Sequence, residues 1–156
     1  MTGKWNHPHP GPLPEGEGVN ILVVDDEPIV CASYQRILAD DGLNVRPAFS
    51  GQEALDRIEN ECFDLAILDL RIPAPGGLTL LRHMRKESPG TEVIVITGYP
   101  TIENAKESMR LGAFDFVPKP FDPETVRRAV IDALACVPWT LKRKEVSSCR
   151  PTPEEY

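Results

Sequence analysis

Five short apolar runs alternate with stretches of helical periodicity along most of this chain, and this alternation constrains the fold more than any other feature. The runs occupy residues 21–24, 44–49, 65–68, 93–96 and 114–117. The segments between them place apolar residues three or four positions apart, as amphipathic helices do. Near-continuous apolar strands that alternate with helices are typical of a parallel sheet covered on both faces. We therefore predict an α/β fold in which a βα unit is repeated five times.

Proline indicates which runs lie at the edges of this sheet. Pro47 interrupts the second run and Pro118 follows the fifth, and proline cannot donate a hydrogen bond to a neighbouring strand. The other three runs are apolar throughout and suit the middle. The order 2-1-3-4-5 with right-handed crossovers meets these conditions. This is the flavodoxin-like order of a doubly wound, three-layer sandwich, in which ligands bind beyond the carboxyl ends of the strands where the order reverses.

Local signals mark the start of two helices. Ser50 and Glu53 have the spacing of a capping box, and Asp122 followed by Pro123 is typical of an N-cap and the first helical position. Apolar residues then repeat at helical spacing from Val126 to Val137. We predict that this last helix covers the sheet.

Length and composition suit one folded domain with extensions. The chain has 156 residues, about the length of one domain. We predict a disordered, Pro- and Gly-rich leader at 1–18, a folded domain at 20–137 and a polar tail or linker at 138–156. The net charge of −7 argues against non-specific binding to nucleic acids or anionic membranes. The sequence contains no stretch typical of a membrane span or signal peptide, so we predict a cytoplasmic protein.

The cysteines carry no pattern typical of a metal site. They stand at positions 31, 62, 136 and 149, with neither a C-x-x-C pair nor a histidine at zinc-ligand spacing. We interpret them as buried free thiols.

The carboxyl ends of the predicted strands collect reactive side chains. Asp25 and Asp26 follow the first run, Asp69 the third, Thr97 the fourth and Lys119 the fifth. An aspartate at a strand end is often only the cap of the next helix, but here all four ends carry groups that suit one reaction. If the first and third strands are neighbours, three carboxylates converge.

Such a cluster needs a counter-charge. At an effective dielectric constant of about 20, two carboxylates 4 Å apart repel by about 4 kcal/mol. A divalent cation relieves this repulsion, and an all-oxygen site suits Mg²⁺. A carboxylate can then act as the nucleophile that accepts a phosphoryl group. Thr97 would donate a hydrogen bond to that group and Lys119 would neutralise its charge.

Three stretches give the chain a family resemblance. They read ILVVDDEP at 21–28, DLAILDLRIPAPGGLTLL at 64–81 and VIVITGYPTIENAKESMRLGAFDFVPKPF at 93–121. The chain resembles the receiver domain of a two-component response regulator, which has the fold of the single-domain chemotaxis regulator. The third stretch is especially similar to receivers that precede enhancer-binding transcription activators.

The resemblance implies a role for each matching residue. Asp69 would be the phosphoacceptor, and Asp25 and Asp26 would hold Mg²⁺ together with Asp69 and the backbone carbonyl of Arg71. Thr97 would be the switch hydroxyl, Phe116 the switch aromatic residue, and Lys119 the lysine that precedes a cis bond to Pro120. One departure is Gly76, which stands where the family more often has Asp and which we expect to loosen the start of the third helix.

The resemblance also implies partners. A sensor histidine kinase or a histidine phosphotransfer protein would supply the phosphoryl group, and a downstream effector protein would bind a surface around the fourth helix, fifth strand and fifth helix. The same surface could form a phosphorylation-dependent dimer. The protein would catalyse only its own phosphorylation and dephosphorylation. Neither direct DNA binding nor membrane binding is expected.

Several alternatives are open at this stage. The chain could be a single-domain regulator or a receiver fragment of a longer transcription activator. An aspartate-nucleophile phosphatase would need an acidic residue two positions after the nucleophile, where Arg71 stands. A passive, unphosphorylated interaction module would not need the complete set of reactive residues. Arg71 and Tyr99 are expected to border the path of a hydrolytic water to Asp69, which would prolong the phosphorylated state.

Overall fold

A single parallel sheet forms the centre of the molecule. The computed structural model describes residues 18–39 and 42–135. Five strands pair in the order β2-β1-β3-β4-β5, and every pairing is parallel. This confirms the predicted doubly wound fold and its strand order. Residues 1–17 of the predicted leader and the whole predicted tail lie outside the described residues, as does Val137.

The elements alternate along the chain as predicted. The strands are β1 (Asn20–Val24), β2 (Asn44–Ala48), β3 (Leu65–Leu68), β4 (Glu92–Thr97) and β5 (Asp115–Pro118). The helices are α1 (Pro28–Ala39), α2 (Gly51–Asn60), α3 (Gly77–Glu87), α4 (Ile102–Arg110) and α5 (Pro123–Ala135). Strand bounds differ from the predicted runs by at most one residue at either end, because the apolar runs coincide with the buried parts of the strands.

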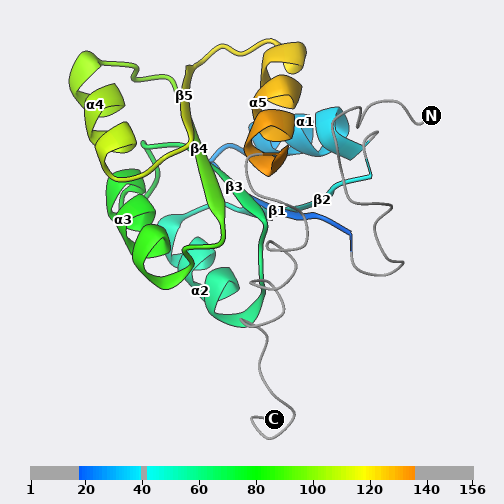
Figure 1. Cartoon of the computed structure of the whole chain (residues 1–156), viewed down its shortest axis with the longest axis horizontal. Coiled ribbons are helices and arrows are strands. Elements are labelled where there is room, and N and C mark those ends of the chain that lie inside the picture. The colour runs from blue at the N-terminus through cyan, green and yellow to red at the C-terminus, as the bar shows by residue number, and fades with distance from the viewer. Residues whose placement is uncertain (1–17, 40–41, 136–156) are drawn as a thin grey trace, which may run out of the picture.

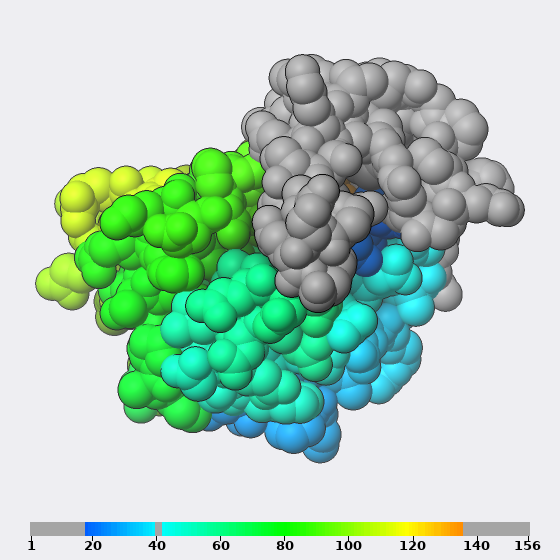
Figure 2. Space-filling view, turned by 90° about the horizontal axis from the view of Figure 1, so that it is seen from below, coloured from blue at the N-terminus to red at the C-terminus, as the bar shows by residue number. Residues whose placement is uncertain are grey.

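Helices cover both faces of the sheet, with α1 and α5 on one side and α2, α3 and α4 on the other (Figure 1). Side chains of each strand alternate between two cores, so Ile21 packs beneath α1 and α5 while Leu22 packs beneath α2 and α3. Figure 2 shows α2 and α3 side by side on the second face. Burial on both faces explains why the central strands are apolar between their end residues, with polar groups only at Asn20, Glu92 and Thr97.

Both predicted helix starts are present. The Ser50 hydroxyl accepts a hydrogen bond from the Glu53 amide at 3.1 Å, and the Glu53 carboxylate accepts one from the Phe49 amide at 2.8 Å. The Asp122 carboxylate accepts one from the Glu124 amide at 3.2 Å. These contacts pair the Glu53 and Glu124 amides of the first helical turns and the Phe49 amide just before α2.

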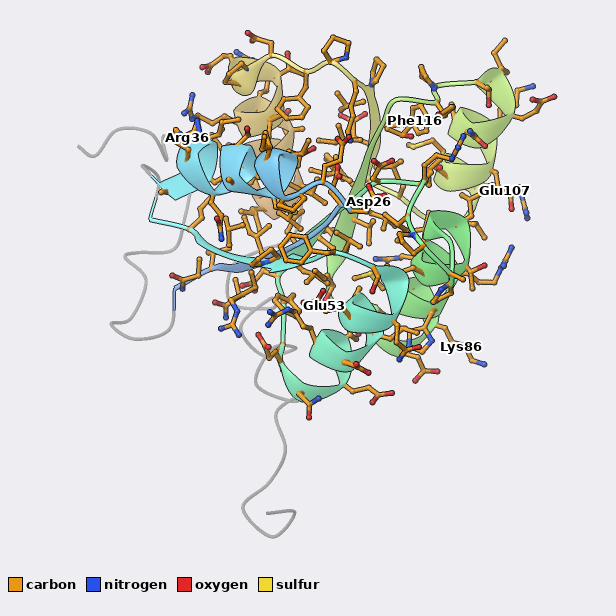
Figure 3. The ribbon with its side chains drawn as sticks, turned by 180° about the vertical axis from the view of Figure 1, so that it is seen from behind. Asp26, Arg36, Glu53, Lys86, Glu107 and Phe116 are labelled. Atoms are coloured by element: carbon orange, nitrogen blue, oxygen red, sulfur yellow. The ribbon has the colours of Figure 1, made fainter. Side chains whose placement is uncertain are left out.

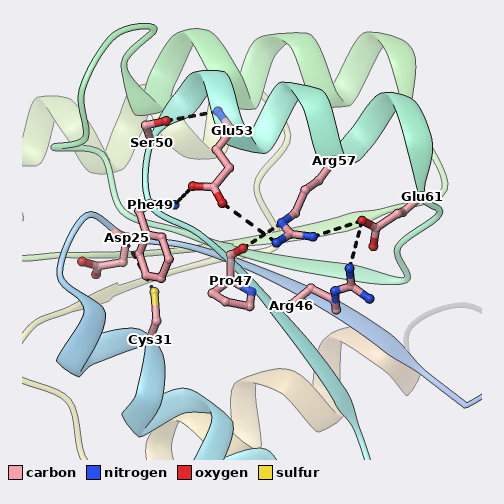
Figure 4. A network of polar contacts seen from close by, with 9 residues as sticks. All are labelled: Asp25, Cys31, Arg46, Pro47, Phe49, Ser50, Glu53, Arg57 and Glu61. Atoms are coloured by element: carbon pink, nitrogen blue, oxygen red, sulfur yellow. Dashed lines mark hydrogen bonds and ion pairs between the residues drawn. The ribbon is translucent and has the colours of Figure 1, made fainter.

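The edge strand β2 is held by side chains of α2 and of Glu61, the residue that follows it (Figure 4). The Arg57 guanidinium donates to the carbonyl of Pro47 at 2.8 Å, and it pairs with Glu61 at 3.1 Å. Glu61 also pairs with Arg46 of the strand at 3.3 Å. The carbonyl of Pro47, the proline that marks this strand as an edge, is therefore hydrogen-bonded, so this backbone acceptor is not left unpaired.

The cysteines only partly follow the prediction. Cys31 is a buried free thiol, as expected. Cys62 is half-buried and disulfide-bonded, which contradicts the predicted free thiol. Cys136 and Cys149 lie outside the described residues.

The helices of this fold are short. Among residues 18–39 and 42–135, none reaches the length and apolar character that a bilayer span requires.

The start of α3 lacks a side-chain cap, as the glycine at its N-cap position leads one to expect. Gly76 has φ −67° and ψ 173°, and no side chain caps the helix. A Cβ at Gly76 would meet no atom within 4 Å. We expect Gly76→Asp to raise the free energy of unfolding in urea by about 0.5–1 kcal/mol, because it adds a cap and restrains the unfolded chain.

Gly112→Asp is the matched control. Gly112 has φ +106°, and a Cβ there would lie 3.1 Å from the Arg85 Nε. The same substitution should therefore lower the free energy of unfolding by about 1–3 kcal/mol. A destabilised Gly76→Asp variant would contradict this account of the α3 start.

Candidate functional site

Three carboxylates meet where β1 and β3 end. Asp25, Asp26 and Asp69 each offer an oxygen, and these oxygens lie within 4.8 Å of one another. Asp25 and Asp69 are buried, whereas Asp26 is exposed at the junction of β1 and α1 (Figure 3). In the described part of the chain this is the one group of three or more acidic, histidine or cysteine side chains with such geometry. The strand order therefore brings the predicted carboxylates together.

Lys119 connects two of these carboxylates. Its Nζ lies 2.7 Å from Asp25 Oδ2 and 2.9 Å from Asp69 Oδ2. These partners are 94 and 50 positions away in the sequence. Burial lowers the pKa of the Lys119 ammonium, but its hydrogen bonds to the two aspartates outweigh burial and hold that pKa above its usual value. Lys119 is therefore a cation at neutral pH.

One ammonium does not balance three carboxylates. Burial raises the pKa of the Asp25 carboxyl, and the hydrogen bonds from Lys119 and the Glu27 amide only partly oppose this effect. Lys119 neutralises one of the three negative charges and leaves two. A set of oxygen donors with this residual charge fits a divalent cation such as Mg²⁺.

The loop after Asp69 is held close to the acidic cluster. The Arg71 amide donates to Asp69 Oδ1 at 3.1 Å, which places the Arg71 backbone beside the carboxylate. A Cβ at Gly77 would lie 2.7 Å from the carbonyl oxygen of Asp69. A Cβ at Gly51, the first residue of α2, would collide with the carbonyl oxygen of Pro75. Sequence reasoning missed both glycines, since only the packed loop shows how closely the backbones approach.

Thr97 and Phe116 lie on the neighbouring strands β4 and β5. Thr97 is completely buried, and its hydroxyl oxygen accepts a hydrogen bond from the Tyr99 amide at 3.1 Å. Phe116 pairs with Val95, two positions before Thr97 in β4. Its ring is half-buried and packs against the core beneath α2 and α3. The Lys119–Pro120 bond is cis, as the resemblance implies.

Arg71 and Tyr99 contact one another across two loops. The Arg71 Cζ lies 3.9 Å from the centroid of the Tyr99 ring. The sequence places both residues two positions after a predicted site residue, but it does not show that their side chains stack. The contact joins the loop that follows β3 to the loop that follows β4.

Comparisons with known proteins give one consistent picture. A family model described as the response regulator receiver domain matches residues 21–131. The transcriptional regulatory protein ZraR of Escherichia coli is 34% identical over 119 residues, which cover 76% of this chain and 27% of ZraR. The alginate biosynthesis transcriptional regulatory protein AlgB of Pseudomonas aeruginosa is 34% identical over 114 residues, which cover 73% of this chain and 25% of AlgB.

A solved structure agrees. The crystal structure of a CheY-like receiver domain protein from Methanospirillum hungatei matches with a TM-score of 0.74 and 33% identity, and the match covers 83% of this chain and 99% of that one. The chain spans about a quarter of the length of the two curated relatives, which are 27% and 25% covered. Both relatives are transcriptional regulators, in agreement with the predicted similarity to receivers of transcription activators.

The buried charge of Asp25 should make metal-free protein sensitive to pH. A carboxyl whose pKa is higher in the folded than in the unfolded state destabilises the fold as pH rises through that pKa. In EDTA, Asp25→Asn should therefore raise the free energy of unfolding at pH 7. This gain should disappear below the unfolded pKa of 3.8. Urea unfolding at both pH values measures the effect.

Asp132→Asn is the control, because Asp132 is exposed on α5. We expect it to change the free energy of unfolding by less than about 0.5 kcal/mol at either pH. An Asp25→Asn variant less stable than wild type at pH 7 would show that the ionised carboxylate stabilises the fold.

Proposed function

Because the chain belongs to the response regulator receiver domain family, we propose that it accepts a phosphoryl group on Asp69 and signals through the resulting change of its surface. The observation that carries this proposal is the Asp69 carboxylate, which is buried beside Asp25 and Asp26 and bound by Lys119. A carboxylate in this setting is a nucleophile with a counter-charge for its product close at hand.

The proposed transfer starts from a phosphohistidine. An Asp69 carboxylate oxygen attacks the phosphorus and forms an O–P bond, while the N–P bond breaks and the imidazole nitrogen keeps the electron pair. A separate hydrolysis step consumes water, which attacks the phosphorus while the Asp69 O–P bond breaks, so that inorganic phosphate leaves and the carboxylate is restored. Lys119 and the Thr97 hydroxyl would stabilise the charge on the phosphoryl oxygens during both steps.

Asp25, Asp26 and Asp69 would hold Mg²⁺, with the backbone carbonyl of Arg71 as a further ligand. When bound, the ion supplies charge that draws the phosphoryl oxygens toward the acidic cluster. The residual negative charge of the cluster and the position of the Arg71 backbone, whose amide lies 3.1 Å from Asp69 Oδ1, support this set of ligands.

Thr97 and Phe116 would transmit the effect of phosphorylation from Asp69 to the protein surface. The Thr97 hydroxyl oxygen accepts a hydrogen bond from the Tyr99 amide, and its O–H would donate to a phosphoryl oxygen on Asp69, which would draw the hydroxyl toward the site. Its movement would vacate space that the half-buried Phe116 ring can enter. A ligand shifts the equilibrium between the two states of such a surface only by the difference between its binding free energies for them, which is of the order of 1–3 kcal/mol.

The phosphoryl donor would be a sensor histidine kinase or a histidine phosphotransfer protein, and the output would be a downstream effector that binds α4, β5 and α5. A phosphorylation-dependent dimer through the same elements belongs to this proposal. Similarity to ZraR and AlgB supports the alternative that the chain is a receiver fragment of a longer transcription activator. Three further expectations stay predictions: placement in the cytoplasm, protection of the phosphorylated state by Arg71 and Tyr99, and domain limits at 20 and 137.

Phosphorylation of Asp69 can be tested by intact mass. Wild type incubated with acetyl phosphate and Mg²⁺ should gain one phosphoryl group. In EDTA it should gain none, because the uncompensated carboxylate cluster repels an anionic donor. Asp69→Asn should gain none. Asp56→Asn, at an α2 position away from the site, is the control and should be labelled like wild type. Labelling of Asp69→Asn at the wild-type rate would refute the assignment.

The switch can be tested with Thr97→Ala. This variant should still be phosphorylated, but its changes in amide chemical shifts over residues 101–121 should be smaller than in wild type, because the hydroxyl that links the phosphoryl group to this region is absent. Thr79→Ala, at an exposed position of α3, should respond like wild type. An equal response of Thr97→Ala and wild type would exclude Thr97 as the link.

A further inference from the structure

The stacking of Arg71 on Tyr99 connects the phosphoacceptor loop with the loop that leads into α4. The Arg71 Cζ lies 3.9 Å from the Tyr99 ring centroid. Both residues are exposed, with 48% of Tyr99 accessible to solvent. A cation above an aromatic ring at an exposed site is held weakly. The contact can therefore be displaced by a stronger partner.

The backbone of Tyr99 links Thr97 to the start of α4. Its amide donates to the Thr97 hydroxyl oxygen at 3.1 Å. Its carbonyl accepts from the Asn104 side-chain amide and from the Thr101 backbone amide, both at 2.9 Å. Thr101 in turn caps α4 through a hydrogen bond from the Asn104 amide. A displacement of the Tyr99 backbone would therefore also displace the first turn of α4.

A phosphoryl group on Asp69 would attract both groups that hold Tyr99, the Arg71 guanidinium and the Thr97 hydroxyl. The Arg71 amide lies only 3.1 Å from Asp69 Oδ1, so the guanidinium of the same residue is attached beside the phosphorylation site. A guanidinium forms charge-assisted, often bidentate hydrogen bonds with phosphoryl oxygens, and these are stronger than a cation–π contact in water. The Thr97 O–H can donate to a further phosphoryl oxygen, and movement of the hydroxyl toward that oxygen would break the hydrogen bond that it accepts from the Tyr99 amide.

We propose that Arg71 and Tyr99 form a latch that phosphorylation opens. In the unphosphorylated protein the Arg71 guanidinium rests on the Tyr99 ring. After phosphorylation it transfers to the phosphoryl group, and Tyr99 loses its contacts with Arg71 and Thr97 together. Arg71 thereby acts as a second sensor of the phosphoryl group, beside Thr97. This inference rests on the proposed phosphorylation of Asp69.

The latch can be observed by NMR of the full chain before and after treatment with acetyl phosphate and Mg²⁺, with phosphorylation confirmed by intact mass. The Arg71 Nε–H proton should move downfield on phosphorylation, because it leaves the shielding face of the ring and binds an anion. The Tyr99 ring signals should shift in the same step. In Tyr99→Leu, the Arg71 Nε–H signal should already lie downfield before treatment.

Arg71→Met keeps the aliphatic stem and removes the charge. In its phosphorylated fraction, quantified by intact mass, the phosphorylation-induced shift of the Tyr99 ring should fall to less than half of the wild-type value. Arg82→Met is the matched control, since Arg82 is an exposed residue of α3 paired with Glu107 at 3.8 Å. Its Tyr99 response should equal that of wild type.

The outcomes separate the two proposals. A wild-type protein that gains no phosphoryl group would overturn the proposed function itself. Full phosphorylation with an unmoved Arg71 Nε–H signal would overturn the latch alone. A Tyr99 response of wild-type size in Arg71→Met would also overturn the latch, because the ring would then respond without the guanidinium.

Discussion

All five strands run in one direction, and the rest of the structure depends on this constraint. Each connection must cross a face of the sheet, so every strand is followed by a loop at one edge and a helix on one face. Both faces are then buried, which requires apolar strands and excludes charges from their interiors. Charged groups collect instead where the strands end, and the reversal between β1 and β3 brings Asp25, Asp26 and Asp69 to one point.

The convergence of these carboxylates destabilises the folded state. Burial raises the pKa of Asp25, and the Lys119 ammonium offsets only part of the negative charge. A site assembled for stability alone would contain fewer charges. The unbalanced negative charge suits a divalent cation, and under the proposed function that cation would in turn attract the phosphoryl oxygens. The chemistry proposed for the chain is thus a consequence of the electrostatic imbalance that the sheet creates.

Ion pairs, a hydrogen bond and a cation–π contact connect the loops around the site. Lys119 pairs with Asp25 and Asp69, Thr97 accepts from the Tyr99 amide, and Arg71 stacks on the Tyr99 ring. A phosphoryl group would offer several of these donors a better acceptor at the same time. Under the proposed function, such competition would rearrange these loops and the first turn of α4 together.

The sequence by itself determined the elements, their order in the sheet and the residues at the strand ends. Apolar periodicity indicates the burial of each position, and Pro47 and Pro118 lack the amide donor that a central strand would need. Only the tertiary structure decided which atoms touch: the two oxygens that Lys119 binds, the approach of Gly51 to Pro75, the stacking of Arg71 on Tyr99 and the disulfide-bonded state of Cys62. These contacts join residues far apart in the chain, and their geometry depends on how packed loops settle against one another, which no local pattern of residues encodes.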